Sequence, residues 1–355
     1  MKDIEKYISE NNYIEALNKC FDTNNNYLGI LLCHILSKDI ENPNENCLDT
    51  SKFLTQFQNN INDETKIKVK LLPSWTTSEA LRDTWNRMSK GNYTWNNIKI
   101  VLDDKPDYFV VINAPPYNVK LTEEQKKKTI VFQMEPYMDT INKEKWGEWA
   151  CPDPLKFFKV CSHKLEYNNN EWNLKKTYNE LKSMKMDKDC KLDSVISTVL
   201  SDKYYDPGHI KRIDFVKFLE KKDMSIHVFG SNKFEYTDYK GSLPWYEKDD
   251  AMIPYKYVFN CENTNIKNYF TEKLIDGILA ECLVFYSGCI NIREFIDERA
   301  FIYLELSNFE DDYQKIKKAI EDKEWEKRID TIRIEKLKIL NYLQFFPRLE
   351  RIITI

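Results

Sequence analysis

The sequence contains little glycine, and this scarcity excludes two common nucleotide-binding motifs. Only 8 glycines occur among the 355 residues. They form neither Gly-x-Gly-x-x-Gly nor Gly-x4-Gly-Lys, the patterns in which glycine lets the backbone approach a phosphate closely. A dinucleotide-binding fingerprint and a P-loop are therefore both excluded as sequence signals.

Histidine and cysteine are too dispersed to indicate a metal site. The 4 histidines lie far apart, and the 9 cysteines form no Cys-x-x-Cys pair. The nearest neighbours, Cys33 with His34 and Cys161 with His163, match no zinc-site spacing. The Asp187-Lys-Asp189 triplet has a metal-site spacing, but we reject it because no apolar strand precedes it. We expect no metal cofactor, and scattered cysteines of odd number indicate reduced thiols.

Long apolar runs and a strong net charge are missing as well. The longest apolar run, residues 27–36, is too short to span a bilayer, and the N-terminus lacks the apolar core of a signal peptide. A net charge of −4 gives no general attraction to nucleic acid or to an anionic membrane. We therefore expect a soluble, cytoplasmic protein with no membrane span and no nucleic-acid partner.

The length and the apolar patterns indicate several parts. A chain of 355 residues is longer than one core usually serves, so we expect two domains and an appendage. Residues 1–62 read as short helices, which would form a cap or a small module that holds a protein partner. Strands alternate with helices over 63–186 and again over 187–325, as in α/β domains with mainly parallel sheets. Residues 326–355 read as a C-terminal helix.

Local patterns also predict the bounds of individual elements. A helix is expected at 171–182 and a strand at 192–197. The spacing of Ser307 and Glu310 is typical of a capping box, which would begin a helix that runs to about Ala319. Residues 323–346 are expected to continue as one amphipathic helix.

The most informative stretch runs from residue 255 to residue 303. An apolar strand at 255–263 leads into a helix, and the helix leads into a second apolar strand, which is one βαβ crossover of a parallel sheet. The polar residues lie where the first strand ends and the helix begins, which is where such sheets bind ligands. Lys273 in the first helical turn works against the helix dipole, which indicates a bound anion. The alternative is a solvated loop with ordinary surface charges.

The same stretch resembles a known family. Glu262-Asn263, then Tyr269 six residues later, then Thr271-Glu-Lys273 opening a helix, form the first part of the pattern. An apolar strand that ends in Gly288 completes it. This order resembles the donor-binding motif of glycosyltransferase family ten, the α1,3/4-fucosyltransferases. A long motif of fixed spacing is far more specific than a single glycine pattern.

The resemblance has limits in detail and in extent. Thr264 stands where the family usually has Ser, Asn268 stands where it usually has Asp, and the proline common before the second strand is absent. The resemblance covers roughly residues 129–310 and is absent from the first 62 residues.

The resemblance implies an α/β fold of the GT-B type, in which two Rossmann-like domains face each other across a cleft, here with an N-terminal helical appendage. Residues 63–186 would form the acceptor side and 187–325 the donor side, and a terminal helix often crosses back to the first domain. The implied reaction transfers a sugar, L-fucose from GDP-fucose, with inversion and without a metal. The acceptor would be a hydroxyl of a glycan or glycoconjugate.

The resemblance also assigns roles to individual residues. Glu135, at the end of a strand and followed by Pro136, matches the proposed general base of the family. Arg212, near the start of a helix, matches the arginine that contacts the donor pyrophosphate. The residues implied to bind the donor are Arg212, Asn263 and Lys273 at the pyrophosphate, Tyr269 at phosphate or sugar, and Glu272 at the ribose hydroxyls.

Two alternatives stay open. The first is the same fold with another GDP- or UDP-sugar, because nothing in the sequence reads the base of the nucleotide securely. The second is a non-catalytic binding protein that keeps the fold and uses residues 1–62 for partners. The joint presence of the base and donor-binding residues argues against the second alternative.

Overall fold

The computed structural model of the chain describes residues 2–9, 13–22, 29, 32, 66–136, 146–167 and 171–354. These residues divide into two compact units, 1–68 with 94–99 and 69–93 with 100–355.

The first unit contains two of the helices expected in the N-terminal segment. Helices α1 (Lys2–Ser9) and α2 (Tyr13–Asp22) bury Ile4, Ala16 and Leu17. Apart from residues 29 and 32, the rest of the predicted helical appendage lies outside the described residues.

One six-stranded sheet has the order β2-β3-β1-β4-β5-β6. Its strands are β1 (Ile67–Pro73), β2 (Thr94–Trp95), β3 (Ile98–Ile100), β4 (Tyr108–Ile112), β5 (Thr129–Gln133) and β6 (Lys159–Ser162). The neighbours β1, β4, β5 and β6 pair in parallel, whereas β2 and β3 form an antiparallel pair. Strand β5 is buried along its whole length, as its continuous apolar sequence predicts for a covered parallel sheet.

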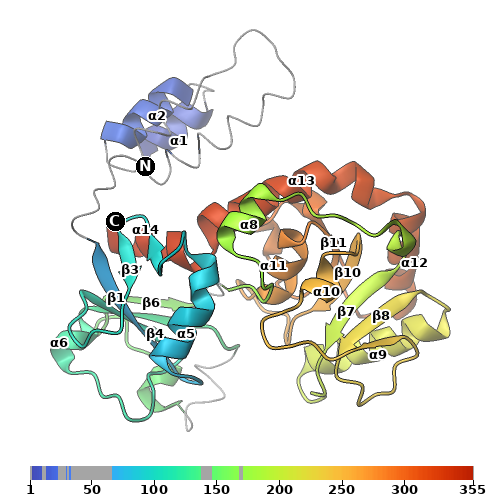
Figure 1. Cartoon of the computed structure of the whole chain (residues 1–355), viewed down its shortest axis with the longest axis horizontal. Helices are drawn as coiled ribbons and strands as arrows, with labels where there is room; N and C mark the ends of the chain where they lie inside the picture. The colour runs from blue at the N-terminus through green and yellow to red at the C-terminus, as the bar shows by residue number, and fades with distance from the viewer. Residues whose placement is uncertain are drawn as a thin grey trace. The chain divides into compact units, whose positions relative to one another are not determined.

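A second six-stranded sheet has the order β12-β11-β10-β7-β8-β9, and its neighbours pair in parallel. Its strands are β7 (Ile196–Leu200), β8 (Ile226–Gly230), β9 (Tyr239–Gly241), β10 (Tyr257–Cys261), β11 (Leu283–Ser287) and β12 (Phe301–Tyr303). The interior strands β10 and β11 are fully buried. The expected βαβ crossover therefore lies inside this sheet, between the edge strand β12 and the strand β7 (Figure 1).

The helices connect and cover these strands. Their bounds are α5 (Ser78–Trp85), α6 (Glu123–Lys126), α8 (Tyr178–Ser183), α9 (Pro207–Lys221), α10 (Asp249–Met252), α11 (Glu272–Leu279), α12 (Phe309–Glu321), α13 (Glu324–Lys338) and α14 (Phe345–Thr354). Helix α9 joins β7 to β8, and α11 joins β10 to β11. The two connections leave the centre of the sheet in opposite directions, so right-handed crossovers place these helices on opposite faces. The order reverses between β7 and β10, and such reversal points are where open sheets bind ligands.

The C-terminal segment returns to the first sheet. Helix α13 ends at Lys338, and after a π-turn and the extended residue Gln344 a new helix, α14, begins. The ring of Phe345 lies 4.6 Å from that of Trp85 and 5.9 Å from that of Phe132. The predicted single helix over 323–346 is therefore wrong at its end. The chain stays helical through the π-helix Ile339–Leu343, but Gln344 leaves the helix and its amide donates to the Met88 carbonyl at 3.1 Å.

Other predicted bounds differ for reasons of local capping. The helix expected at 171–182 begins only at Tyr178, because Thr177 and Glu180 form a capping box. The strand expected at 192–197 begins at Ile196, after a short 3₁₀ turn. Helix α12 is capped by Asn308, whose side chain accepts from Glu310 N–H, and not by Ser307.

Gly208 permits the close approach of α9 to the end of β10, and this contact generates a first prediction. Its N–H donates to the Asn263 carbonyl at 2.9 Å, and a Cβ at this position would lie 1.8 Å from the Glu262 carbonyl oxygen. We expect Gly208→Ala to lower the free energy of unfolding by about 1–3 kcal/mol or more, because backbone must move to accept the methyl group. Denaturant unfolding measures this change. Lys211→Ala, on the same helix, is the control, with an expected change within about 0.5 kcal/mol; equal effects of the two variants would contradict the close approach.

Candidate active site

Two adjoining pockets lie at the carboxyl ends of the strands. The first, which we call the sheet pocket, has a volume of about 550 Å³ and is lined by residues that follow β7, β8 and β10, with Glu272 and Lys273 at the start of α11. The second, the interdomain pocket, has a volume of about 440 Å³ and adds Asn113 and Glu135 from the first sheet and Tyr269. Asn263, Glu272 and Lys273 line both pockets. The sheet pocket opens at the reversal between β7 and β10, as expected for a doubly wound sheet.

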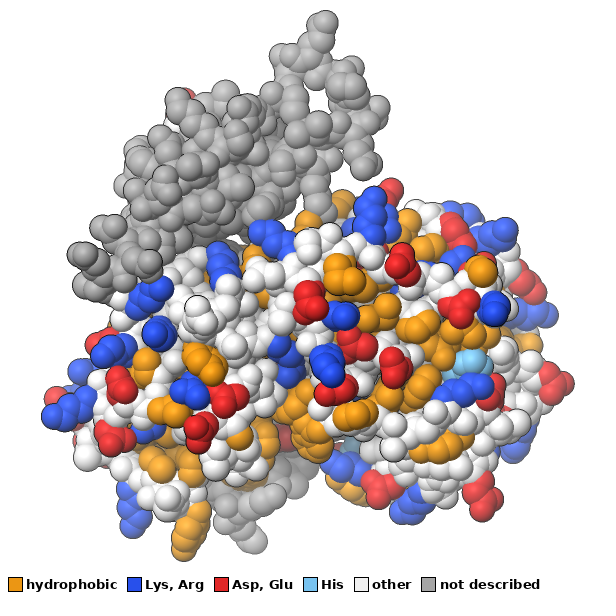
Figure 2. All heavy atoms as spheres, viewed as in Figure 1, with side chains coloured by type: hydrophobic (Ala, Val, Ile, Leu, Met, Phe, Trp, Pro, Cys, Tyr) orange, Lys and Arg blue, Asp and Glu red, His pale blue; other side chains and the backbone are white. Residues whose placement is uncertain are grey.

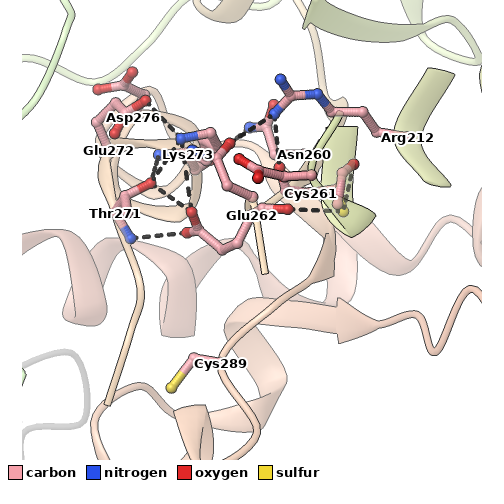
Figure 3. A network of polar contacts seen from close by, with 12 residues as sticks. Arg212, Asn260, Cys261, Glu262, Thr271, Glu272, Lys273, Asp276 and Cys289 are labelled. Atoms are coloured by element: carbon pink, nitrogen blue, oxygen red, sulfur yellow. Dashed lines mark hydrogen bonds and ion pairs between the residues drawn. The ribbon is translucent and has the colours of Figure 1, made fainter. Parts of the chain in front are cut away.

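A buried carboxylate holds the start of α11 against the end of β10. Glu262 is fully buried and accepts hydrogen bonds from Thr271 N–H at 2.8 Å, from the Thr271 hydroxyl at 2.6 Å and from the Tyr286 hydroxyl at 3.3 Å. Burial raises the pKa of Glu262. A Cβ on Gly288 would lie 2.4 Å from Glu262 Cγ, so only glycine leaves room for this side chain. Figure 3 shows Glu262 and Thr271 joined by these contacts.

The first turn of α11 presents a lysine and a glutamate to both pockets. Lys273 Nζ donates to the Thr271 hydroxyl at 3.2 Å and lies 3.1 Å from Glu272 Oε1 and 3.7 Å from Glu262 Oε2. Burial opposes ionisation of Glu272, but the ammonium groups of Lys273 and Lys248 outweigh it and lower the pKa of Glu272 to about 2. Lys273 thus lies beside an ionised Glu272 at the N-terminus of α11, and the free N–H groups of a helix N-terminus are suited to anions.

Arg212 connects the ends of β7 and β10. Its guanidinium is buried and donates to the Cys261 carbonyl and to Asn263 Oδ1, both at 3.3 Å, and to Ser201 Oγ at 3.1 Å. Its Nε is buried without a hydrogen-bond partner in the part of the chain that the structure describes. Burial lowers the pKa of Arg212, which nevertheless stays far above neutral pH as for every arginine. The cation thus lines the sheet pocket at the end of β10. Figure 3 shows Arg212 beside Cys261 at this end.

Glu135 and Tyr269 line the interdomain pocket. Glu135 follows β5, is exposed, and donates its backbone N–H to Asn113 Oδ1 at 3.2 Å. Tyr269 is buried, and its ring lies edge-on to His163 with 6.4 Å between ring centroids. Burial, together with the carboxylates of Glu262 and Glu135, holds the pKa of Tyr269 well above its usual value. A phenol that stays protonated can donate a hydrogen bond into the pocket.

The structure thus brings most of the predicted site residues together. Glu135, Asn263, Tyr269, Glu272 and Lys273 line the interdomain pocket. Arg212 lines only the sheet pocket, where it bonds Asn263.

Sequence reasoning missed three charged residues at this site. The sequence assigns Glu262 to a motif but gives it no role of its own. Lys248 lies 24 positions before Glu272 and belongs to no local pattern. The sequence pattern places Glu171 on a helix, whereas the helix begins only at Tyr178. Lys248 Nζ lies 3.0 Å from Asp276 Oδ2 and 3.7 Å from Glu272 Oε1. Burial opposes its charge, but Asp276 and Glu272 raise the pKa of Lys248. The sequence signals for Glu262 are its place in the motif and its position at the end of an apolar strand, and neither indicates that it holds the start of α11.

His209, to which the sequence assigns no role, lines the sheet pocket. It lies in the first turn of α9 with its ring buried, 3.3 Å from Asp206 Oδ2. Burial and the cations Arg212, Lys203 and Lys273 lower the pKa of His209 to about 4. The imidazole is therefore neutral near pH 7.

The residues that the structure describes contain neither a cluster suited to a metal ion nor a helix suited to cross a membrane. Within the described ranges, no group of three or more His, Cys, Asp or Glu side chains is arranged to hold a metal ion. None of the helices described here is long and apolar enough to cross a membrane.

Comparison with known proteins relates the C-terminal part of the chain to one family. Residues 190–323 match the family model described as Glycosyltransferase family 10 (fucosyltransferase) C-term. This match confirms, for that part of the chain, the resemblance found in the sequence. No curated protein matches the chain significantly.

Solved structures of similar fold are glycosyltransferases. An alpha-glucosyltransferase in complex with UDP-glucose and DNA containing an abasic site superposes with a TM-score of 0.51 at 10% identity, over 81% of this chain and 99% of that one. The same enzyme type with UDP and a 13-mer DNA containing a central A:G mismatch gives 0.51 at 11% identity, over 81% and 99%. An alpha1,3-fucosyltransferase structure covers 80% of this chain and 83% of its own at 14% identity, with a TM-score of 0.46. At such identities the glucosyltransferase likeness shows the fold alone, which is the predicted GT-B arrangement.

The Glu262 contacts predict a large stability effect. Glu262→Ala would leave the Thr271 amide and the hydroxyls of Thr271 and Tyr286 without their buried acceptor. We expect the free energy of unfolding to fall by about 2–5 kcal/mol, since leaving buried donors unpaired costs about 1–3 kcal/mol each and such costs are not additive. Denaturant unfolding is the measurement. The exposed residue Glu124 supplies the control, Glu124→Ala, with an expected change within about 0.5 kcal/mol; a Glu262→Ala protein as stable as this control would refute the account of the network.

Proposed function

We propose that this protein transfers a sugar from a nucleoside diphosphate sugar, GDP-fucose, to a hydroxyl of a glycan acceptor, with inversion at the anomeric carbon. The observation that carries the proposal is the convergence of Lys273, Asn263 and the N-terminus of α11 on a pocket that Glu135 also lines. Donor-side cations and an acceptor-side carboxylate are the two parts that such a transfer needs.

The donor would lie in the sheet pocket with its diphosphate at the start of α11. Lys273 is the cation nearest to the free end of this helix, and Arg212 lies under the same pocket with an unpaired buried Nε. Asn263, held by Arg212, offers its amide N–H₂ to the pyrophosphate. These positive groups would stabilise the charge that develops on the departing diphosphate, the part that a divalent metal plays in other transferases. Because these protein groups would take the place of a metal ion at the diphosphate, we include transfer without a metal in the proposal.

The acceptor would enter the interdomain pocket, where Glu135 would act as general base. The acceptor hydroxyl oxygen attacks the anomeric carbon as the bond from that carbon to the β-phosphate oxygen breaks. The hydroxyl proton passes to the Glu135 carboxylate, and the nucleoside diphosphate leaves with the bonding electrons. Attack from the face opposite the leaving group inverts the anomeric centre. The acceptor is proposed to be carbohydrate because the family match indicates a glycan-modifying enzyme.

The face shown in Figure 2 gives no indication of a polyanionic acceptor. On the face shown in Figure 2, Lys and Arg side chains are interspersed with Asp and Glu side chains among the described residues. The net charge of the sequence is −4. Although the glucosyltransferases of similar fold were solved with DNA, binding to the phosphate backbone of DNA depends on clustered positive charge.

The donor side generates a binding prediction. Lys273→Met should weaken GDP binding about tenfold to hundredfold, because a hydrogen bond to a charged group contributes about 1.5–3 kcal/mol. Calorimetric titration with GDP, and with UDP in parallel, is the measurement. Lys267→Met is the matched control, because Lys267 is exposed in the same loop and lines neither pocket. Binding of UDP with no response to GDP would overturn the proposed donor.

The acceptor side generates a catalytic prediction. Glu135→Gln should lower the rate of sugar transfer by about 10²- to 10⁴-fold, the usual contribution of a general base, and leave the Kd for GDP within about twofold. GDP released from GDP-fucose in the presence of a glycan panel measures transfer, and calorimetry measures binding. Glu124→Gln is the control. If Glu135→Gln abolished GDP binding as well, Glu135 would have a structural role instead.

A further inference from the structure

A third carboxyl group faces the interdomain pocket from the segment that joins the two sheets. Glu171 lines this pocket together with Glu135 and Glu272. Its Oε2 accepts a hydrogen bond from the indole N–H of Trp85 at 2.9 Å. Trp85 is 1% exposed and packs on Phe345, so this contact holds the carboxyl group in a fixed position.

Charged and titratable groups face Glu171 from each element packed around it. Arg87 lies beside it on the first-sheet side, and Tyr246 and Lys248 precede α10. Glu272 and Asp276 face it from α11. Arg87 also lies over the Tyr246 ring, with its Cζ 4.6 Å from the ring centroid.

Burial is the largest influence on Glu171, and it raises the pKa of this group to about 7. The Trp85 hydrogen bond and Arg87 oppose the rise, whereas Glu272 and Asp276 add to it. Glu272, by contrast, has its pKa lowered to about 2. Glu171 therefore titrates near neutral pH while Glu272 of the same pocket stays ionised, and carboxyl groups whose pKa values are pushed apart are typical of sites that move protons.

The donor proposed for the adjoining sheet pocket would change that balance. Lys273 lines both pockets, so a nucleoside diphosphate at Lys273 brings at least two negative charges to the edge of the pocket that Glu171 lines. Like charges disfavour the ionised carboxylate, so a bound diphosphate makes the protonated form more favourable. A neutral carboxyl group also avoids repelling the diphosphate and gains an O–H that can donate to an oxygen of the bound substrate.

We propose that Glu171 takes up one proton from solvent when a nucleoside diphosphate binds, and that the donor complex contains Glu171 in its neutral form. This inference rests on the proposed function, because it assumes a diphosphate at Lys273. It makes Glu171 a positioning residue of the donor complex, separate from Glu135, which receives the proton of the acceptor.

The direction of the pH effect follows from linkage. Below about pH 7 Glu171 already holds its proton in the free protein, so GDP binding requires no uptake and affinity is greatest. Above pH 7 each binding event takes up a proton, so the Kd for GDP rises with pH, by at most tenfold per pH unit for one proton. Gln is a neutral mimic of the protonated group, and its amide oxygen can still accept from Trp85.

The test is calorimetric titration of GDP into the wild-type protein and Glu171→Gln between pH 7 and 8.5, in buffers of different ionisation enthalpy. The wild type should take up a larger fraction of a proton than Glu171→Gln, and its Kd should rise several-fold more over this range. Titration of the GDP phosphate contributes equally to both proteins and cancels in the comparison. Glu124→Gln, which alters an exposed acid, should behave as the wild type does. Equal proton uptake and equal pH dependence in the wild type and Glu171→Gln would overturn the proposal.

A second variant tests the same group from the other side. Trp85→Phe removes the hydrogen bond that favours the ionised carboxylate, so Glu171 should keep its proton to higher pH. The rise in the Kd for GDP should then begin at a higher pH than in the wild type, and an unchanged onset would contradict the proposal. If the wild type binds neither GDP nor UDP, the proposed function falls and this inference falls with it. If GDP binds without a proton uptake that depends on Glu171, only this inference falls.

Discussion

The site depends on one buried carboxylate, that of Glu262. A fully buried acid is costly unless hydrogen bonds offset its desolvation, and here the Thr271 amide and two hydroxyls supply them. Because those donors lie at the start of α11 and on β11, the carboxylate joins three successive elements of the crossover. The first turn of α11, with Lys273, is thereby held at a fixed place relative to the end of β10.

Glycine determines how closely the surrounding backbone can approach this carboxylate. Gly288 leaves the space that the Glu262 side chain fills, and Gly208 lets α9 approach the carbonyl of the same residue. The sequence has only 8 glycines, and two of them lie against one residue. The chain thus has close backbone packing although it has no glycine-rich phosphate loop. Here the close packing positions the side-chain cations Lys273 and Arg212.

The sequence allowed the fold and the strongest motif to be predicted, because apolar strands and an uninterrupted βαβ pattern are local signals. Glu135 and Lys273 line one pocket because each follows or opens an element of that kind, and their proposed roles stay predictions. The local pattern predicts Glu171 on a helix. It misses the true position because that position depends on a hydrogen bond from Trp85, 86 positions earlier in the sequence. Lys248 was missed for the same reason, because its ion pair with Asp276 spans 28 positions and leaves no periodic pattern.

The central claim is that the ends of β7 and β10 and the start of α11 hold a nucleoside diphosphate. Hydrogen–deuterium exchange of the full chain with and without GDP tests it most directly, since backbone protection reports where the ligand lies. The account predicts slower exchange in peptides that cover residues 198–213 and 260–275, with residues 66–112 unchanged. Protection confined to the first sheet, or no protection at saturating GDP and UDP, would contradict it.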